Sequence, residues 1–107
     1  MKWTAMKPDR VLAMLSIAAK AGKIASGAFS AEKAIKSGKA FLVILAENAS
    51  ENTKKKFKNA CDYRNIPVYE YSASRMLGGS TGKEDRMVLA LLDEGLAGSI
   101  EARINEA

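Results

Sequence analysis

"KAIKSGKAFLVILAENAS", residues 33–50, contains the end of one helix, a buried strand and the start of another helix. Its central run, "FLVILA" at 41–46, is apolar without alternation, which indicates a strand covered on both faces. Gly38 ends the helix before this strand, and Ser50 can cap the helix after it. A strand enclosed by helical segments in this way favours an α/β fold.

Helical and extended patterns alternate through the rest of the chain. Helices are expected at 8–21, 28–37, 51–65 and 93–106, strands at 23–26, 67–71 and 86–92, and a short helical turn at 72–77 leading into a glycine loop. This order predicts a three-layer α/β/α sandwich with a small mixed β-sheet. We expect a single domain over residues 1–107, in which 1–6 form a loose N-terminal extension.

Apolar content and cysteine number indicate the compartment. The hydrophobic fraction is 48%, yet the longest apolar run, 40–46, is too short to span a bilayer. The N-terminal "MKWTAMKPDR" has no apolar signal-peptide region. The lone cysteine, Cys61, cannot form an internal disulfide, which fits a reducing compartment, and we expect it to be a packed core thiol. The sequence therefore predicts a cytoplasmic protein that does not enter membranes.

Two residue types that often serve in catalysis or bind metals are absent or rare in this chain. The chain has no histidine and one cysteine. Histidine-based acid–base catalysis, Ser-His or Cys-His nucleophiles, His-ligated metals and zinc ribbons are therefore excluded. We expect no enzymatic activity, no metal site and no cofactor.

The positive charge is concentrated in the first part of the chain. Residues 1–60 carry 12 Lys and Arg against 4 Asp and Glu, whereas 61–107 carry 5 against 8, for a net charge of +5. Such an uneven distribution of charge favours a surface that binds a polyanion, most often a nucleic acid. The alternative is that the lysines only form the solvated sides of helices. The run of lysines within 54–58 has the same two interpretations: the solvated side of a helix, or an accessory phosphate contact.

The segment "LGGSTGKEDR", residues 77–86, is the nearest approach to a nucleotide-binding loop. A P-loop needs four residues between its glycines, but only three separate Gly78 from Gly82. Glu84 stands where the magnesium-binding hydroxyl should be. The loop is therefore not expected to bind a nucleotide.

Five motifs in fixed order carry a family resemblance: "AGKIASG", "KAIKSGKAFLVILAENAS", "NTKKKF", "IPVY" and "LGGSTGK". Over residues 8–100 the chain resembles the small ribosomal RNA-binding proteins, whose best-known member is the archaeal large-subunit kink-turn binder. It looks most like the bacterial YlxQ-like branch. The resemblance implies a non-catalytic α/β/α domain that binds a kink-turn, a sharply bent RNA duplex with a bulge and tandem sheared G·A pairs.

The resemblance also implies where RNA would bind: at the start of the second helix and in two neighbouring loops. The implied RNA-binding residues are Lys23, Gly27, Ala28, Phe29, Ser30, Lys33, Lys36, Glu47, Asn48, Leu77, Gly78 and Ser80. A helix N-terminus favours phosphate, and glycine lets a backbone approach RNA closely. Lys23 and Lys39 are expected to be outlying phosphate contacts.

The chain departs from the family pattern at the second helix. Kink-turn binders open this helix with Gly-x-Asn-Glu-x-x-Lys, whereas "GAFSAEK" keeps Gly27 and Lys33 but has Phe29 and Ser30 in place of Asn and Glu. Phe29 has three interpretations: a core residue, a platform for a splayed base, or part of a protein interface. Leu77 either packs in the core or covers a splayed base. Ser80 stands where the family has a small apolar residue.

These observations favour a monomeric, non-catalytic protein that binds structured RNA, such as ribosomal RNA or the ribosome. One alternative is a protein-interaction module that kept the fold and lost specific RNA readout, which Phe29 favours. A second is a small enzyme or nucleotide binder that uses Gly82 and Lys83.

Overall fold

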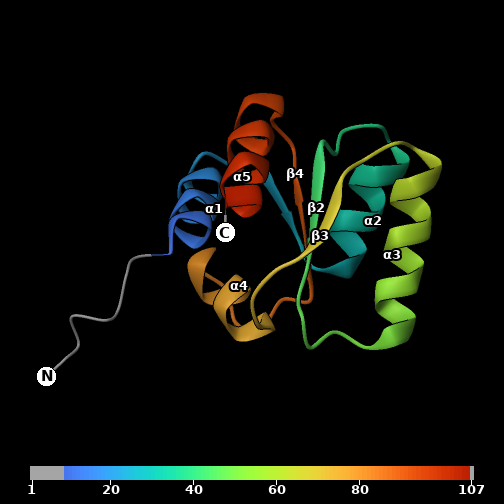
Figure 1. Cartoon of the computed structure of the whole chain (residues 1–107), viewed down its shortest axis with the longest axis horizontal. Coiled ribbons are helices and arrows are strands. Elements are labelled where there is room, and N and C mark those ends of the chain that lie inside the picture. Colours follow the sequence, from blue (N-terminus) through green and yellow to red (C-terminus); the bar gives the residue numbers. More distant parts are fainter. Residues whose placement is uncertain (1–8, 107) are drawn as a thin grey trace, which may run out of the picture.

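The computed structural model of the chain describes residues 9–106 (Figure 1). In chain order its elements are α1 (Arg10–Lys20), β1 (Ile24–Ser26), α2 (Ala28–Lys36), β2 (Leu42–Leu45), α3 (Glu51–Tyr63), β3 (Val68–Glu70), α4 (Ser74–Ser80), β4 (Val88–Leu91) and α5 (Glu94–Glu106). Each predicted helix and strand is present, with shifts of at most three residues at the ends. The expected extension at 1–6 lies outside the described residues.

A mixed four-stranded sheet forms the middle layer, in the order β1-β4-β2-β3. β4 pairs antiparallel with both β1 and β2, whereas β2 and β3 run parallel. Helices α1, α4 and α5 cover one face, and α2 and α3 cover the other (Figure 1). The predicted three-layer α/β/α sandwich with a small mixed sheet is confirmed.

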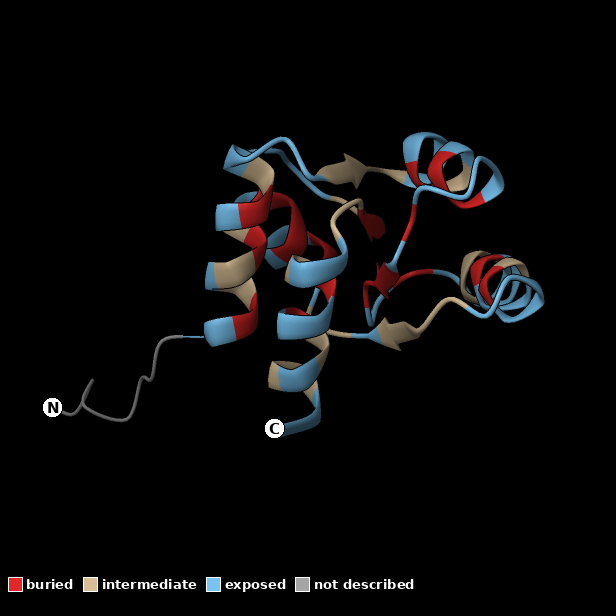
Figure 2. Cartoon of the chain, turned by 90° about the horizontal axis from the view of Figure 1, so that it is seen from above, coloured by how far each residue is buried: buried red, intermediate tan, exposed pale blue. Residues whose placement is uncertain are grey.

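Burial on both sides explains why β2 is apolar without alternation. Leu42 and Ile44 belong to the core under α1, α4 and α5, while Val43 and Leu45 belong to the core under α2 and α3. All four side chains are fully buried. The helices turn their buried residues toward the sheet and their exposed residues outward (Figure 2). The central strand thus contributes to two cores at once.

Side-chain caps begin two helices, at Asp9 and, as predicted, at Ser50. The Asp9 carboxylate accepts a hydrogen bond from the Leu12 N–H at 2.9 Å at the start of α1, and the Ser50 hydroxyl accepts one from the Thr53 N–H at 3.1 Å at the start of α3. Cys61 is buried, as predicted, and burial raises the pKa of its thiol to about 11. Among the helices within residues 9–106, none combines the length and the apolar character needed to cross a membrane.

The glycine loop differs from expectation, because α4 continues through Gly78 and Gly79 to Ser80. Two contacts outweigh the poor helix propensity of glycine. The Thr81 hydroxyl donates to the carbonyl oxygens of Leu77 and Gly78, each at 3.0 Å. A Cβ atom on Gly78 would overlap the carbonyl oxygen of Glu84, so only glycine lets these two segments pack. Tertiary packing therefore makes this segment helical.

The connections gather at two opposite ends of the sheet (Figure 1). We call the end with the β1–α2 and β2–α3 turns and both connections of α4 the proximal end; its segments are 26–28, 46–50, 71–74 and 81–87. The distal end holds the α1–β1, α2–β2, α3–β3 and β4–α5 connections, at 21–23, 37–41, 64–67 and 92–93.

Candidate nucleic-acid interface

The start of α2 presents an uncapped helix N-terminus at the proximal end. Gly27 precedes the helix with φ 92° and ψ 164°, a backbone conformation that is essentially restricted to glycine. Its N–H donates to the Val88 carbonyl at 2.9 Å, and its carbonyl accepts from the Ala31 N–H at 2.9 Å. Since Gly27 provides no side-chain cap, the first-turn N–H groups and the positive end of the helix dipole are available to an anion.

Arg86 lies beside this helix start. Its Nε donates to the Ser26 hydroxyl at 3.0 Å, across 60 residues of sequence, and its Nη1 donates to the Asp85 carbonyl at 2.9 Å. A Cβ atom on Gly27 would lie 3.8 Å from Cδ of Arg86. Sequence reasoning missed Arg86, because its position depends on the pairing of β1 with β4, and no local pattern gives that register.

Asn48 joins the β2–α3 turn to the start of α4. Its side-chain nitrogen donates to the Ser74 hydroxyl at 3.0 Å, and its side-chain oxygen accepts from the Ser74 N–H at 2.8 Å. Next to it, the Glu47 N–H donates to the Ser72 carbonyl at 2.8 Å. The Asn48 amide is therefore already used to hold two loops together, while the side chain of Glu47 is exposed at the proximal end.

Phe29 is 82% exposed, so the interpretation of this residue as part of the core is wrong. The reason is geometric: α2 buries Ala31, Ala34 and Ile35 against the sheet, and position 29 falls on its outer side. There Phe29 shares a helix face with Lys33, four residues further on. These two line a hollow of about 410 Å³ with Glu32, Lys36 and Ser37.

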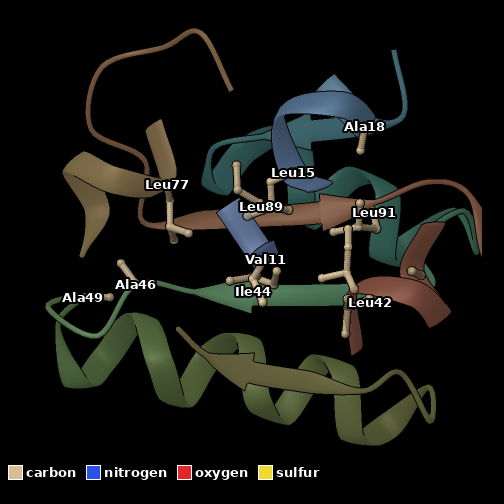
Figure 3. Packing of buried hydrophobic residues seen from close by; sticks show 12 residues of the cluster. Val11, Leu15, Ala18, Leu42, Ile44, Ala46, Ala49, Leu77, Leu89 and Leu91 are labelled. Carbon is tan, nitrogen blue, oxygen red and sulfur yellow. The ribbon is translucent and has the colours of Figure 1, made fainter. Parts of the chain in front are cut away.

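Three α4 residues behave differently from what the resemblance implied. Leu77 is fully buried in the same core cluster as Leu89 of β4, so it is a core residue and its side chain is not available to cover a base (Figure 3). Gly78 is also buried, and the space a side chain would take is filled by Glu84 rather than left open for RNA. Ser80 lines a hollow on the α1 side, with Ser16 and Lys20, away from the start of α2.

A third hollow, of about 500 Å³, lies between α4 and the segment before β4. Its lining residues are Arg75, Gly79, Lys83, Glu84, Asp85 and Arg86. Within residues 9–106, the side chains of Arg75, Lys83 and Arg86 form no ion pair with a carboxylate. Their charge is therefore available to an anionic ligand at this end.

The lysines within 54–58, by contrast, are mostly engaged in ion pairs. Glu70 contacts Lys54 at 3.1 Å and Lys58 at 2.6 Å. Glu32 contacts Lys56 and, on its own helix, Lys36, each at 3.1 Å. Hydrogen bonds from these lysines lower the pKa of both carboxyl groups. Lys55, Lys56 and Lys58 are thus exposed on α3 while Lys54 is largely covered, and part of the charge of the run is compensated.

The structure brings some of the implied residues together and separates others. Gly27, Ala28, Phe29 and Ser30 form the start of α2, Lys33 follows one turn later, and Glu47 and Asn48 lie in the neighbouring turn of the proximal end. Lys36 ends α2. Lys23 and Lys39 lie at the distal end, because each follows the end of a helix that runs away from the proximal end.

Comparisons with known proteins agree with this architecture. The family model described as "Ribosomal protein L7Ae/L30e/S12e/Gadd45 family" matches residues 9–100. The RNA-binding protein YlxQ of Bacillus subtilis (strain 168) is 39% identical over 87 residues, which cover 81% of this chain and 87% of the relative. The family description names ribosomal proteins, the name of this relative states RNA binding, and neither name is that of an enzyme.

Solved structures share the fold. A protein of unknown function from Bacillus halodurans C superposes with a TM-score of 0.89 at 34% identity, covering 92% of this chain and 99% of that one. The 15.5 kD RNA binding protein of Giardia lamblia superposes with a TM-score of 0.76 at 20% identity, covering 95% and 91%, a likeness of fold alone. The extent of the family match and the identity to YlxQ lead to one conclusion. The chain belongs to the ribosomal protein L7Ae/L30e/S12e/Gadd45 family.

Proposed function

We propose that this protein binds structured RNA through its proximal end and performs no catalysis. The observation that carries the proposal is the uncapped start of α2 with the guanidinium of Arg86 hydrogen-bonded beside it. The relative named as RNA-binding, together with family membership, supports RNA as the polyanion. A kink-turn is the RNA shape that the resemblance implies.

The proposed contacts follow from the local chemistry. Backbone phosphate meets the free N–H groups in the first turn of α2, where the helix dipole also favours negative charge. Arg86 is held by Ser26 and by a backbone carbonyl, so its remaining guanidinium N–H groups are pre-oriented for a bidentate contact with phosphate or a guanine edge. Lys33 extends the positive surface along the helix.

Phe29 replaces a base-reading amide with an aromatic ring. Because it is exposed beside Lys33, we propose that it stacks on a nucleotide displaced from the duplex. Recognition would then rest on shape and stacking at this position, rather than on the edge contacts that Asn and Glu provide elsewhere in the family. We further propose that the protein acts as a monomer in the cytoplasm, with ribosomal RNA among its targets.

The decisive experiment is a fluorescence-anisotropy titration of a labelled kink-turn RNA at several salt concentrations. The control is the same duplex without its bulge. We expect preference for the kink-turn to persist at high salt, since contacts to shape and bases do not depend on counterion release. Equal binding to both RNAs that fades steeply with salt would replace the kink-turn with general phosphate binding. Absence of binding to both would refute the proposed function.

The exposure of Phe29 also favours the alternative of a protein-interaction module. The hollow beside its ring is completed by Glu32, Lys33, Lys36 and Ser37, so a protein partner seated there would also have to meet three charged side chains. A nucleotide-binding role is tested by thermal unfolding with saturating ATP and magnesium. We expect no rise in Tm, whereas a ligand specific for the folded state would raise it.

A further inference from the structure

We propose that Lys36 and Lys56, bridged by Glu32, form a phosphate clamp that extends the RNA surface from α2 onto α3. This inference rests on the proposed function and adds a second contact outside the proximal end. The clamp would hold the backbone of the RNA stem that continues past the start of α2.

The three side chains form one unit across two helices. Each oxygen of the Glu32 carboxylate contacts one ammonium group: Oε2 lies 3.1 Å from Nζ of Lys36, and Oε1 lies 3.1 Å from Nζ of Lys56. The Glu32 side chain is 31% exposed, whereas those of Lys36 and Lys56 are 68% and 56% exposed. The carboxylate is therefore the more covered group, and the two ammonium groups face solvent with a net positive charge.

The position of the unit connects it to the proposed site. Glu32 and Lys36 line the same hollow as Phe29 and Lys33. Lys36 lies about 12 Å along the axis from the first residue of α2, at about 1.5 Å per residue. An RNA strand bound at the helix start and running along α2 would therefore pass over this hollow and reach the clamp.

A second cluster of one glutamate and two lysines differs from the clamp in the exposure of its lysines. Glu70 also contacts two lysines, Lys54 and Lys58, but the side chain of Lys54 is only 14% exposed. That cluster stabilises the packing of α3 against the end of β3, and it lines none of the three hollows described above. Of the two clusters, only the one around Glu32 has both cations more than half exposed, and two of its members, Glu32 and Lys36, line a hollow.

Pre-orientation is the physical advantage of the arrangement. A free lysine loses several rotamers when it binds phosphate, which weakens the contact. Glu32 already restrains Lys36 and Lys56, so less freedom is lost when RNA arrives. Glu32 is thus a positioning residue, and its removal should weaken RNA binding even though it makes the protein more positive. Simple charge attraction predicts the opposite.

The test compares two RNAs, a kink-turn with a short stem and one whose stem is long enough to reach past α2. For K36Q/K56Q we expect about tenfold weaker binding of the long-stem RNA and a salt dependence shallower by about 1.8, at ~0.9 for each lost phosphate contact. Binding of the short-stem RNA should weaken no more than it does in the charge control, because the short stem ends before the clamp. The matched control is K55Q/K58Q, which removes the same charge from the exposed side of α3 and should change binding to both RNAs equally.

The sharper variant is Glu32→Gln, with Glu70→Gln as its control. We expect E32Q to bind the long-stem RNA about threefold more weakly, while E70Q binds as the unaltered protein does or slightly better. Equal strengthening in both variants would overturn the clamp, as would a K36Q/K56Q protein that binds the long stem normally. If the unaltered protein binds neither RNA, the proposed function fails and the clamp fails with it. Thermal unfolding of each variant checks that the fold is retained.

Discussion

Gly27 and Gly78 both lie near the proximal end, yet each must be glycine for a different physical reason. Gly27 is required by its backbone, because φ 92° and ψ 164° exclude other residues, and the space beside it holds only the flexible side chain of Arg86. Gly78 is required by its surroundings, because the Glu84 backbone occupies the place of a side chain. A glycine near a binding surface thus indicates close approach, but the partner can be the protein itself.

Gly78→Ala should have the largest effect on stability, about 3 kcal/mol or more, since a fixed backbone oxygen must move to admit the methyl group. Urea unfolding measures the loss. Gly79→Ala is the matched control: a Cβ there meets no atom within 4 Å, and alanine suits a helix better. We expect G79A to be neutral or slightly stabilising. Equal stability of the two variants would contradict the close packing of α4 on Glu84.

Arg86→Gln should lower the affinity for kink-turn RNA by about tenfold or more, because a charge-assisted contact of about 1.5–3 kcal/mol is lost. Anisotropy titration measures the change, with Arg103→Gln on α5 as the control for charge alone. This variant tests the surroundings of Gly27 separately from those of Gly78, since it removes a side chain beside Gly27 and leaves the packing of Gly78 unchanged. An R86Q protein that binds as tightly as R103Q would remove Arg86 from the interface.

Gly27→Ala should cost about 1–3 kcal/mol of folding free energy through backbone strain, although no atom blocks the methyl group. RNA affinity should fall at the same time, because relief of that strain shifts the start of α2. Chemical denaturation and RNA titration on one sample give both values. Gly22→Ala, which also has positive φ but lies at the distal end, should lose stability without loss of RNA affinity.

Phe29→Ala should leave stability within about 0.5 kcal/mol, since the ring is largely exposed. Kink-turn affinity should fall by about 1–3 kcal/mol if one base stacks on the ring. Phe29→Tyr, which keeps the aromatic face, should retain most of the affinity. If F29A binds normally, the exposed ring beside Gly27 has no role in RNA recognition.

The elements of the fold could be predicted from the sequence, because their signals are local. The run 41–46 predicts a strand buried on both faces, Ser50 predicts a helix cap, and Cys61 is predicted to lie in the core. Each of these predictions is confirmed. The end of α4 could not be predicted in this way. Its helical continuation through Gly78 and Gly79 depends on Thr81 and on the returning segment at Glu84, which no propensity includes.

The features of the candidate site also fall into two groups, those that the sequence predicts and those that depend on the tertiary structure. By itself the sequence determined the layered α/β/α fold and the helix start after Gly27, through hydrophobic periodicity and the placing of glycines. The family resemblance came from five motifs in fixed order. Only the tertiary structure decided that Leu77 points inward, that Phe29 points outward and that Arg86 lies against Ser26. These outcomes depend on strand register and helix packing between distant segments, and such contacts leave no mark on the local pattern of residues.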